Sequence, residues 1–120
     1  MSDAVKQERR RAQRVDATLA INLHLDTGGG RAETLDVSAN GVHFRAPEYI
    51  EPMTKLAMSF DVEIGDEDPC TVECEGIVAR VRPELPSEAA DGYEVAVFFT
   101  TIDAESLHHL ERYVELRLAN

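Results

Sequence analysis

The sequence predicts a single all-β domain with one C-terminal helix, arranged as a small antiparallel β-barrel or sandwich. A length of 120 residues suits one compact domain, and 43% hydrophobic with 29% charged residues is the balance of a packed globular chain. Through most of the chain, apolar residues alternate with polar ones in short runs separated by turn residues, which is the pattern of half-buried strands. Only the C-terminal run has the spacing of a helix.

The first three strands are expected in the N-terminal half. The run 15–25 alternates leucine and isoleucine with more polar residues, and the glycine-rich stretch 26–30 after it is expected to be a turn. A second strand is expected at 31–37 and a third at 42–46. The tetrapeptide Ser-Ala-Asn-Gly between them is typical of a turn, because its polar side chains and its glycine favour tight backbone conformations.

Three further strands follow at similar intervals. The run 53–64 alternates up to the turn cluster Gly-Asp-Glu-Asp-Pro. The run 71–82 has the same alternation, with a phase slip near Gly76 that predicts a β-bulge. A very apolar last strand is expected at 93–99, after a loop at 83–92. Six short antiparallel strands of this kind favour a barrel or a two-layered structure.

The C-terminal run, about 103–119, is expected to be an amphipathic helix. Four apolar residues recur at intervals of three or four, which places them on one helix face. Asp103 precedes them and is a favoured N-cap residue. The apolar face is expected to cover the core of the β structure. Its residues are Leu107, Leu110, Val114 and Leu118.

Charge is divided unevenly along the chain. Residues 1–14 contain five basic and two acidic residues, a net charge of +3, so the formal −11 of the whole chain leaves −14 for residues 15–120. We therefore expect a flexible basic arm at 1–14 and a folded, acidic domain at 15–120. The negative field of that domain disfavours the long phosphate backbone of DNA or RNA. A small anion bound at the arm is still compatible with it.

Several functional classes are disfavoured by features that the sequence lacks. It has no apolar run of bilayer-spanning length and no signal-peptide pattern, so a cytoplasmic protein without membrane insertion is expected. Cys70 and Cys74 have no companion cysteine or nearby histidine, and His108 and His109 diverge on the helix, so no metal site or disulfide is expected. No catalytic grouping of side chains is evident. We expect neither an enzyme nor a bound cofactor.

Two arginines of the arm and a polar motif after the second strand form the candidate site. Arg10 and Arg14 can converge on one ligand, and their planar forks suit phosphate oxygens or the O6 and N7 atoms of guanine. Asp36 and Ser38 are expected to project from one strand face, where the carboxylate can accept from the N1 and N2 donors of guanine. Gly41 stands where a tight turn would need a positive φ. Together these residues predict a site for an anionic guanine nucleotide.

The spaced motifs Arg10-x-x-x-Arg14 and Asp36-x-Ser38-x-x-Gly41 resemble, at all five positions, the two-part motif of PilZ domains. The resemblance implies a six-stranded split β-barrel with a C-terminal helix, and a bacterial receptor for cyclic di-GMP. In it, Arg10 and Arg14 would engage the phosphates and guanine. Asp36 and Ser38 would hold the other base edges, and Gly41 would let the turn backbone approach. Further ligand contacts are expected from Arg9, Arg11, Asn40 and Arg45.

The resemblance also implies how such a receptor would act. The basic arm would close over cyclic di-GMP and so change binding to an effector protein of the flagellar, polysaccharide or secretion machinery, which would regulate motility or biofilm formation. Two alternatives stay open. One is a nucleotide-independent interaction module that uses its acidic surface, and the other is an RNA or DNA binder that uses the arginine arm.

Overall fold

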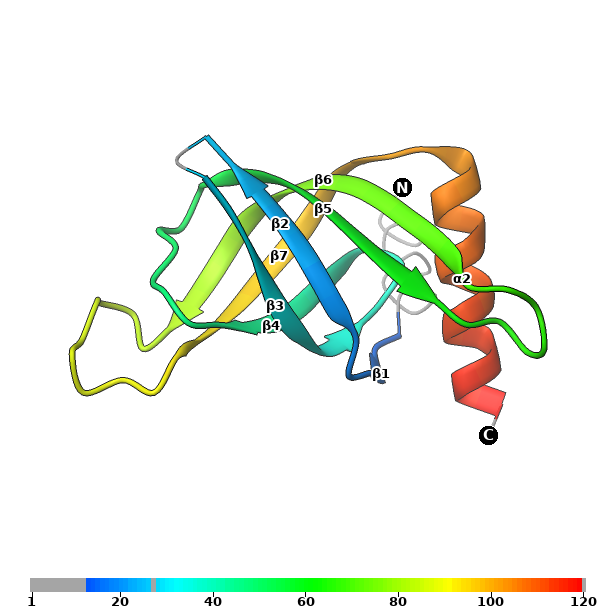
Figure 1. The fold of residues 1–120 in the computed structure, drawn as a ribbon, viewed down its shortest axis with the longest axis horizontal. Helices are drawn as coiled ribbons and strands as arrows, with labels where there is room; N and C mark the ends of the chain where they lie inside the picture. The colour runs from blue at the N-terminus through cyan, green and yellow to red at the C-terminus, as the bar shows by residue number, and fades with distance from the viewer. Residues whose placement is uncertain (1–12, 27, 120) are drawn as a thin grey trace, which may run out of the picture.

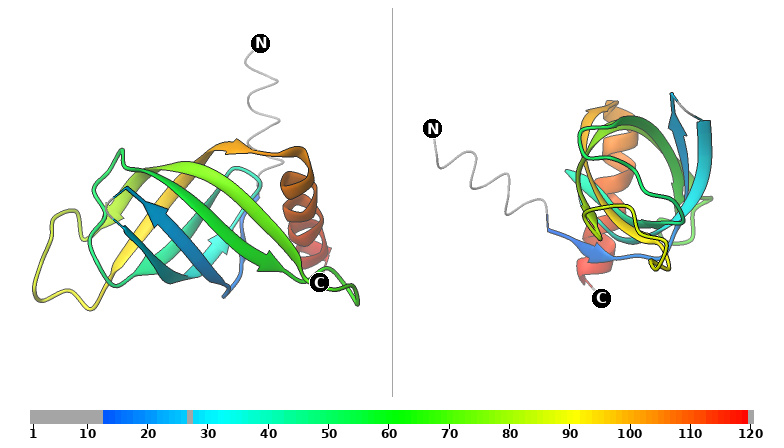
Figure 2. Two further views of the ribbon diagram at one scale, coloured as in Figure 1. Left: turned by 45° about the horizontal axis from the view of Figure 1, so that its top comes forward. Right: turned by 90° about the vertical axis from the view of Figure 1, so that its left-hand side faces the viewer.

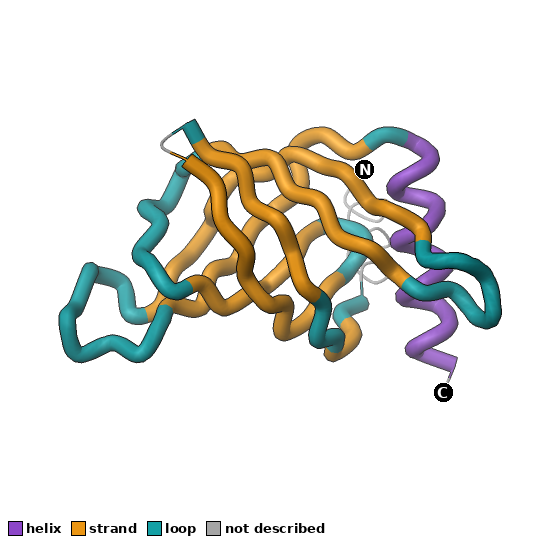
Figure 3. The backbone as a smooth tube through the Cα atoms, in the orientation of Figure 1, coloured by secondary structure: helices purple, strands orange, loops and turns teal. Residues whose placement is uncertain are grey.

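The protein is described by a computed structural model that covers residues 13–26 and 28–119. These residues form seven strands and one helix (Figure 1 and Figure 3). Apart from the first strand, the elements lie close to the runs that the sequence predicted. Their bounds are β1 Val15–Asp16, β2 Ala20–Leu25, β3 Gly28–Val37, β4 Gly41–Ala46, β5 Lys55–Val62, β6 Cys70–Arg82, β7 Tyr93–Ile102 and α2 Ala104–Ala119.

Six strands close into an antiparallel barrel. Their order around it is β3, β2, β5, β6, β7 and β4, and β4 pairs back with β3 to close the ring. The right-hand view of Figure 2 shows these strands around a common interior. The short strand β1 adds to the end of β3, where Val15 pairs with Val37 and Asp16 with Asp36. The expected six-stranded barrel with a C-terminal helix is confirmed, and the β3–β4 pairing decides between barrel and sandwich.

The core fills the inside of the barrel and is built by the alternating residues. In β5, Met58 and Phe60 point inward and are almost fully buried, whereas Asp61 faces solvent. Burying a side chain of this size contributes about 1.5–3 kcal/mol. A strand shifted by one residue would lose that contribution along its whole length, so the alternation selects which face points inward.

Helix α2 crosses one end of the barrel (Figure 1). The expected apolar face is partly wrong: Leu110 and Val114 are buried, but Leu107 is only half-buried and Leu118 is 49% exposed. Helical spacing indicates an apolar face, but which of its residues meet the barrel depends on how the helix crosses the barrel end. The residues that α2 buries are Ser106, Leu110, Tyr113 and Val114.

The first expected strand, 15–25, is divided into β1 and β2 by the side chain of Thr34 in β3. The Thr34 hydroxyl donates to the Ala17 carbonyl at 2.5 Å and accepts from the Leu19 amide at 2.8 Å. It therefore takes the place of a backbone partner between the two strands. Thr34 is buried, and these bonds satisfy its hydroxyl group. The alternating pattern could not predict the interruption, because the bonds come from a different strand.

The glycine-rich stretch after β2 is mostly strand, so the turn expected at 26–30 was too long. Residues 28–30 begin β3 and pair with residues 23–25 of β2. Gly28 has a φ of 134°, which glycine adopts at little cost. The glycines indicate backbone freedom at this turn, but they do not indicate how many residues the turn contains. The bulge that the sequence predicted near Gly76 is confirmed by a register shift at that residue.

Asp103 caps α2 as the sequence predicted. Its Oδ1 accepts from the Ser106 amide at 2.7 Å, which satisfies one of the free N–H groups of the first helical turn. The Ser106 hydroxyl accepts in turn from the Glu73 amide of β6 at 3.0 Å. The cap therefore joins the start of the helix to the barrel.

Replacing Asp103 by alanine should lower the free energy of unfolding by about 1 kcal/mol, the usual cost of losing an N-cap residue. Urea denaturation followed by circular dichroism measures this change. Glu111→Ala, on the exposed side of the same helix, is the matched control and should change stability by less than about 0.5 kcal/mol. Equal stabilities of the two variants would contradict the capping role.

Candidate functional site

Asp36 lies near the end of β3, where strand pairing brings three strands together. It pairs with Asp16 of β1 on one side and with His43 of β4 on the other. Both of its carboxylate oxygens are engaged, since Arg14 Nη1 donates to Oδ1 at 2.6 Å and His43 Nδ1 lies 3.1 Å from Oδ2. The Asp36 side chain is 20% exposed. It can therefore be reached from solvent while being held in one orientation.

His43 continues this network across the outside of the barrel. Its Nε2 lies 3.4 Å from Glu94 Oε1 in β7, and the other Glu94 oxygen lies 3.7 Å from Arg45 Nη2. Acidic and basic side chains thus alternate from β3 through β4 to β7. A neutral imidazole has one N–H and donates to only one of the two carboxylates, whereas a protonated imidazole donates to both.

Ser38 lies in the turn that follows β3 and not on the strand itself. It is buried, its Oγ accepts from the Asn40 amide at 3.1 Å, and its own amide donates to the Gly41 carbonyl at 2.9 Å. Asp36 lies on β3 and Ser38 lies one residue beyond its end at Val37, so the shared strand face expected for the two side chains stays a prediction. The Ser38 hydroxyl shapes the turn, and its contact with a ligand stays a prediction.

Gly41 is required by the packing of two strands. A Cβ built on it would lie 2.3 Å from the Val97 carbonyl oxygen of β7, a clash with paired backbone. The positive φ expected from the turn sequence is wrong, because Gly41 is not among the described glycines that have one. The close approach also brings the turn against β7, where the Phe99 amide donates to the Asn40 carbonyl at 2.9 Å.

The structure describes one of the two motif arginines. Arg14 is joined to Asp36, so the two parts of the sequence motif meet at this contact. The other three arginines of the arm, Arg9, Arg10 and Arg11, lie outside the described residues, and their part in binding stays a prediction.

The two remaining candidates flank the network that Asp36 begins. Asn40 is exposed in the turn after β3, and Arg45 faces outward from β4, two positions after His43. The Arg45 guanidinium lies against Glu94. Both side chains are accessible from solvent, and ligand contact by either stays a prediction.

Strand β6 adds two arginines that sequence reasoning did not single out. Register places Arg80 opposite Ala96 and Arg82 opposite Glu94. With His43, these residues line a hollow of about 50 Å³. The alternate spacing of the two arginines indicates outward-facing positions, but it carries no information on which strand lies beside them.

We call the outward-facing groups around β4 and β7, together with Arg14, the β4–β7 face. Four of the eight lysine and arginine residues at positions 13–119 lie on it, although the whole chain carries a charge of −11. Such a group of cations attracts a small anion locally. Phe98, opposite Gly41 in the register, is 56% exposed and offers a ring on which a base can stack. The face consists of Arg14, Asp36, His43, Arg45, Arg80, Arg82, Glu94, Ala96 and Phe98.

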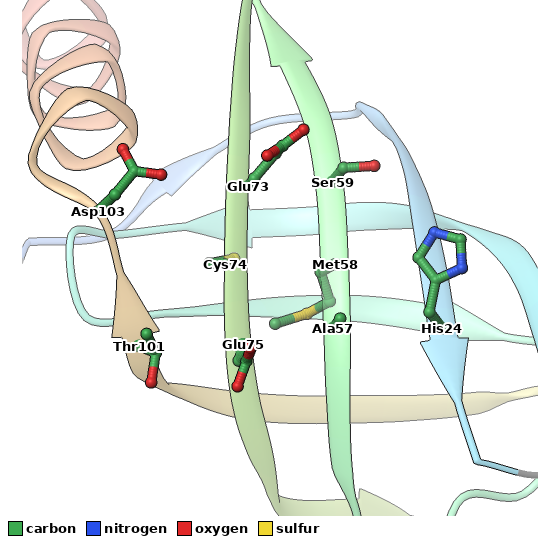
Figure 4. Close-up of a pocket in the computed structure, with 9 residues that line it drawn as sticks. All are labelled: His24, Ala57, Met58, Ser59, Glu73, Cys74, Glu75, Thr101 and Asp103. Atoms are coloured by element: carbon green, nitrogen blue, oxygen red, sulfur yellow. The ribbon is translucent and has the colours of Figure 1, made fainter.

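A larger hollow of about 390 Å³ lies over β5 and β6 (Figure 4). Its charged groups are mainly the carboxylates of Glu73, Glu75 and Asp103, with His24 at its edge. Burial, together with the charge of Asp103, raises the pKa of the adjoining Cys74 thiol to about 12. The thiol is therefore protonated at neutral pH and is a poor nucleophile. An acidic hollow of this kind disfavours a ligand that contains phosphate.

The described ranges 13–26 and 28–119 contain no group of three His, Cys, Asp or Glu side chains placed to hold a metal ion. Within the same ranges, no helix has the length and apolar character needed to cross a membrane.

The fold is similar to those of several solved proteins. The Bacillus subtilis inhibitor of motility MotI/DgrA matches with a TM-score of 0.77 and 19% identity over 93% of this chain and 52% of that one. The PilZ domain of CeSA, from a cellulose-synthesizing bacterium, matches with a TM-score of 0.55 and 12% identity over 90% of this chain and 97% of that one. MrkH of K. pneumonia matches with a TM-score of 0.62 and 13% identity over 92% of this chain and 52% of that one. At these identities the likeness is one of fold, and the chain spans about half the length of MotI/DgrA.

A comparison with curated proteins gave no match. The sequence profile of the PilZ domain family, however, matches residues 8–116, a span that includes every residue of the two-part motif from Arg10 to Gly41. The closed six-stranded barrel with one extra strand and a C-terminal helix agrees with that match. The chain therefore belongs to the PilZ domain family.

Proposed function

We propose that this PilZ domain is a bacterial, non-catalytic receptor that binds cyclic di-GMP on its β4–β7 face. The observation that carries the proposal is the Asp36 carboxylate, held between Arg14 and His43 within a group of cations. A carboxylate accepts from the N1 and N2 donors of guanine, while arginines donate to O6, N7 or phosphate oxygens. The structural relative MrkH was solved as a complex with c-di-GMP, which supports this ligand class.

Binding is proposed to proceed by an exchange of partners at Asp36. Arg14 donates to the Oδ1 atom of Asp36, at a position where a guanine could also bond. The N1 and N2 donors of the base take over the carboxylate, and the released Arg14 turns to the O6 and N7 atoms of the base or to a phosphate. Arg10 then completes the clamp from the arm. Because new charge-assisted bonds replace the one that is lost, the exchange does not leave a charge unpaired.

The movement of Arg14 is proposed to be the signal. Arg14 directly precedes β1, whose Asp16 carbonyl accepts from Arg117 Nε of α2 at 2.9 Å. A shift of Arg14 would therefore displace both the arm and the helix. This displacement would change binding to an effector protein of the flagellar, polysaccharide or secretion machinery. The fold likeness to an inhibitor of motility is compatible with an effector of the flagellar machinery. Since the ligand is an intracellular messenger, the receptor is proposed to act in the cytoplasm.

Calorimetric titration of the whole chain with cyclic di-GMP, with thermal unfolding as a second readout, tests the proposal. We expect saturable binding and a rise in the unfolding temperature, because a ligand that binds only the folded state stabilises it. Folded protein that shows neither would overturn the proposal in favour of a nucleotide-independent interaction module. Long RNA at low salt should not bind, since the domain is strongly acidic.

A further inference from the structure

We infer that the β4–β7 face has a second guanine subsite, formed by Glu94 and Arg80, which takes the second base of cyclic di-GMP. This inference rests on the proposed function and adds to it a pair of residues outside the five-residue motif. It gives a role to the hollow between β4, β7 and β6, whose lining includes both residues.

The second pair has the same chemistry as the first. Asp36 with Arg14 presents an acceptor for the N1 and N2 donors of guanine and a guanidinium for its O6 and N7 atoms. Glu94 with Arg80 presents the same two groups beside His43. Cyclic di-GMP carries two identical bases on opposite sides of a sugar-phosphate ring. A surface with two such pairs therefore matches a ligand with two such bases.

The two carboxylates are also held in the same way. Asp36 contacts Arg14 and His43, and Glu94 contacts Arg45 and His43. His43 is the shared partner, with Nδ1 3.1 Å from Asp36 and Nε2 3.4 Å from Glu94. A neutral imidazole donates to only one of them. When a base replaces its contact with Asp36, His43 can donate to Glu94 and orient it for the second base.

Strand register sets how far apart Asp36 and Arg80 lie, while both carboxylates contact the imidazole of His43. One row of register partners crosses β3, β4, β7 and β6, and neighbouring strands lie about 4.8 Å apart. The row therefore spans roughly 14 Å. Ala96, between His43 and Arg80 in the row, has a small side chain, and the sugar-phosphate ring is assigned to the position above it. In succession, the partners are Asp36, His43, Ala96 and Arg80.

The two arginines of β6 are available to a ligand. Arg80 and Arg82 are exposed, and within the part of the chain that the structure describes neither forms an ion pair. Like charges two positions apart on one strand face repel each other, and an anionic ligand relieves that repulsion. Arg80 belongs to the row that contains Asp36, whereas Arg82 lies opposite Glu94 outside that row, so Arg80 is assigned the base contact.

Calorimetric titration with cyclic di-GMP and with 3′,3′-cyclic GMP–AMP tests the second subsite. Adenine lacks O6, the N1 hydrogen and the 2-amino group, so the mixed dinucleotide satisfies only one subsite. The wild type should prefer cyclic di-GMP by about tenfold, the cost of one lost bidentate base contact. Arg80→Ala and Glu94→Ala should each weaken cyclic di-GMP binding by about tenfold and leave cyclic GMP–AMP binding nearly unchanged, so that the preference disappears. Asp36→Ala should weaken both ligands.

Arg112→Ala and Glu73→Ala are the matched controls, since both residues are exposed and lie outside the β4–β7 face. Arg80→Lys keeps the charge without the fork and should also lose the preference. Thermal unfolding of each variant shows that it is folded. If the wild type binds cyclic di-GMP but Arg80→Ala and Glu94→Ala keep the preference for cyclic di-GMP over cyclic GMP–AMP, the second subsite is wrong and the proposed function stands. The same conclusion follows if the two variants weaken the binding of both ligands equally. Absence of wild-type binding would overturn both.

Discussion

Alanine at position 14 should weaken cyclic di-GMP binding by about a hundredfold and leave the fold almost unchanged. Arg14 donates to Asp36 in the structure and is proposed to pass to the base or phosphate when the ligand binds. Two lost charge-assisted hydrogen bonds, at about 1.5 kcal/mol each, account for that factor. Losing the Arg14–Asp36 pair matters much less for the stability of the fold, because Arg14 is 46% exposed and exposed ion pairs contribute at most about 1 kcal/mol.

Calorimetry measures the affinity of the Arg14 variant and urea denaturation measures its stability. Arg14→Lys separates charge from geometry, because an ammonium group cannot make two parallel bonds, and should recover only part of the affinity. Arg31→Ala is the control, since Arg31 is an exposed arginine of β3 outside the β4–β7 face. Unchanged affinity of Arg14→Ala would rule out the exchange of partners at Asp36.

Alanine at position 41 should destabilise the barrel by about 3 kcal/mol, the upper end of the usual range for overpacking. The added methyl group would lie 2.3 Å from the Val97 carbonyl oxygen. Removing this clash would require β4 and β7 to separate at the point where Gly41 pairs with Phe98. That separation would also displace His43 from its two carboxylates, so cyclic di-GMP binding should fall together with stability. Urea denaturation and calorimetry measure the two effects.

Gly30→Ala is the matched control for Gly41→Ala, because a Cβ on Gly30 meets no atom within 4 Å. Its stability should stay within about 0.5 kcal/mol of the wild type. Gly41→Asn distinguishes packing from backbone conformation. Asparagine tolerates a positive φ, so it would improve on alanine if the turn required one, whereas a larger side chain worsens a steric clash. A Gly41→Asn protein more stable than Gly41→Ala would contradict the packing explanation.

The site pairs its own charges, and in the proposed exchange this favours selectivity over affinity. Arg14 donates to Asp36, and a ligand is proposed to displace it. A ligand that carries only phosphate can attract Arg14 but offers the carboxylate no donor in return, which would leave Asp36 less well satisfied. A guanine supplies the N1 and N2 donors and completes the exchange. The penalty for an unpaired polar group thus acts against nucleotides without guanine.

Patterns that depend on near neighbours in the chain predicted the structure well. The alternation through Met58 and Phe60 gave the correct inward face of β5, and Asp103 is the N-cap because capping involves only the next few residues. Predictions that depended on distant partners were less accurate. Thr34 interrupts the first expected strand through bonds to Ala17 and Leu19, and turn chemistry suggested a backbone reason for Gly41 where the cause is another strand.

The sequence by itself determined the helix, all but the first of the strands and the residue types of the two-part PilZ motif, because side-chain period, capping and motif spacing are local properties of the chain. Only the tertiary structure decided what surrounds that motif. Arg80 and Glu94 reach the neighbourhood of Asp36 because β3 pairs with β4, β4 with β7 and β7 with β6. Strand order and register follow from closing the barrel around its core, and no local pattern contains that information.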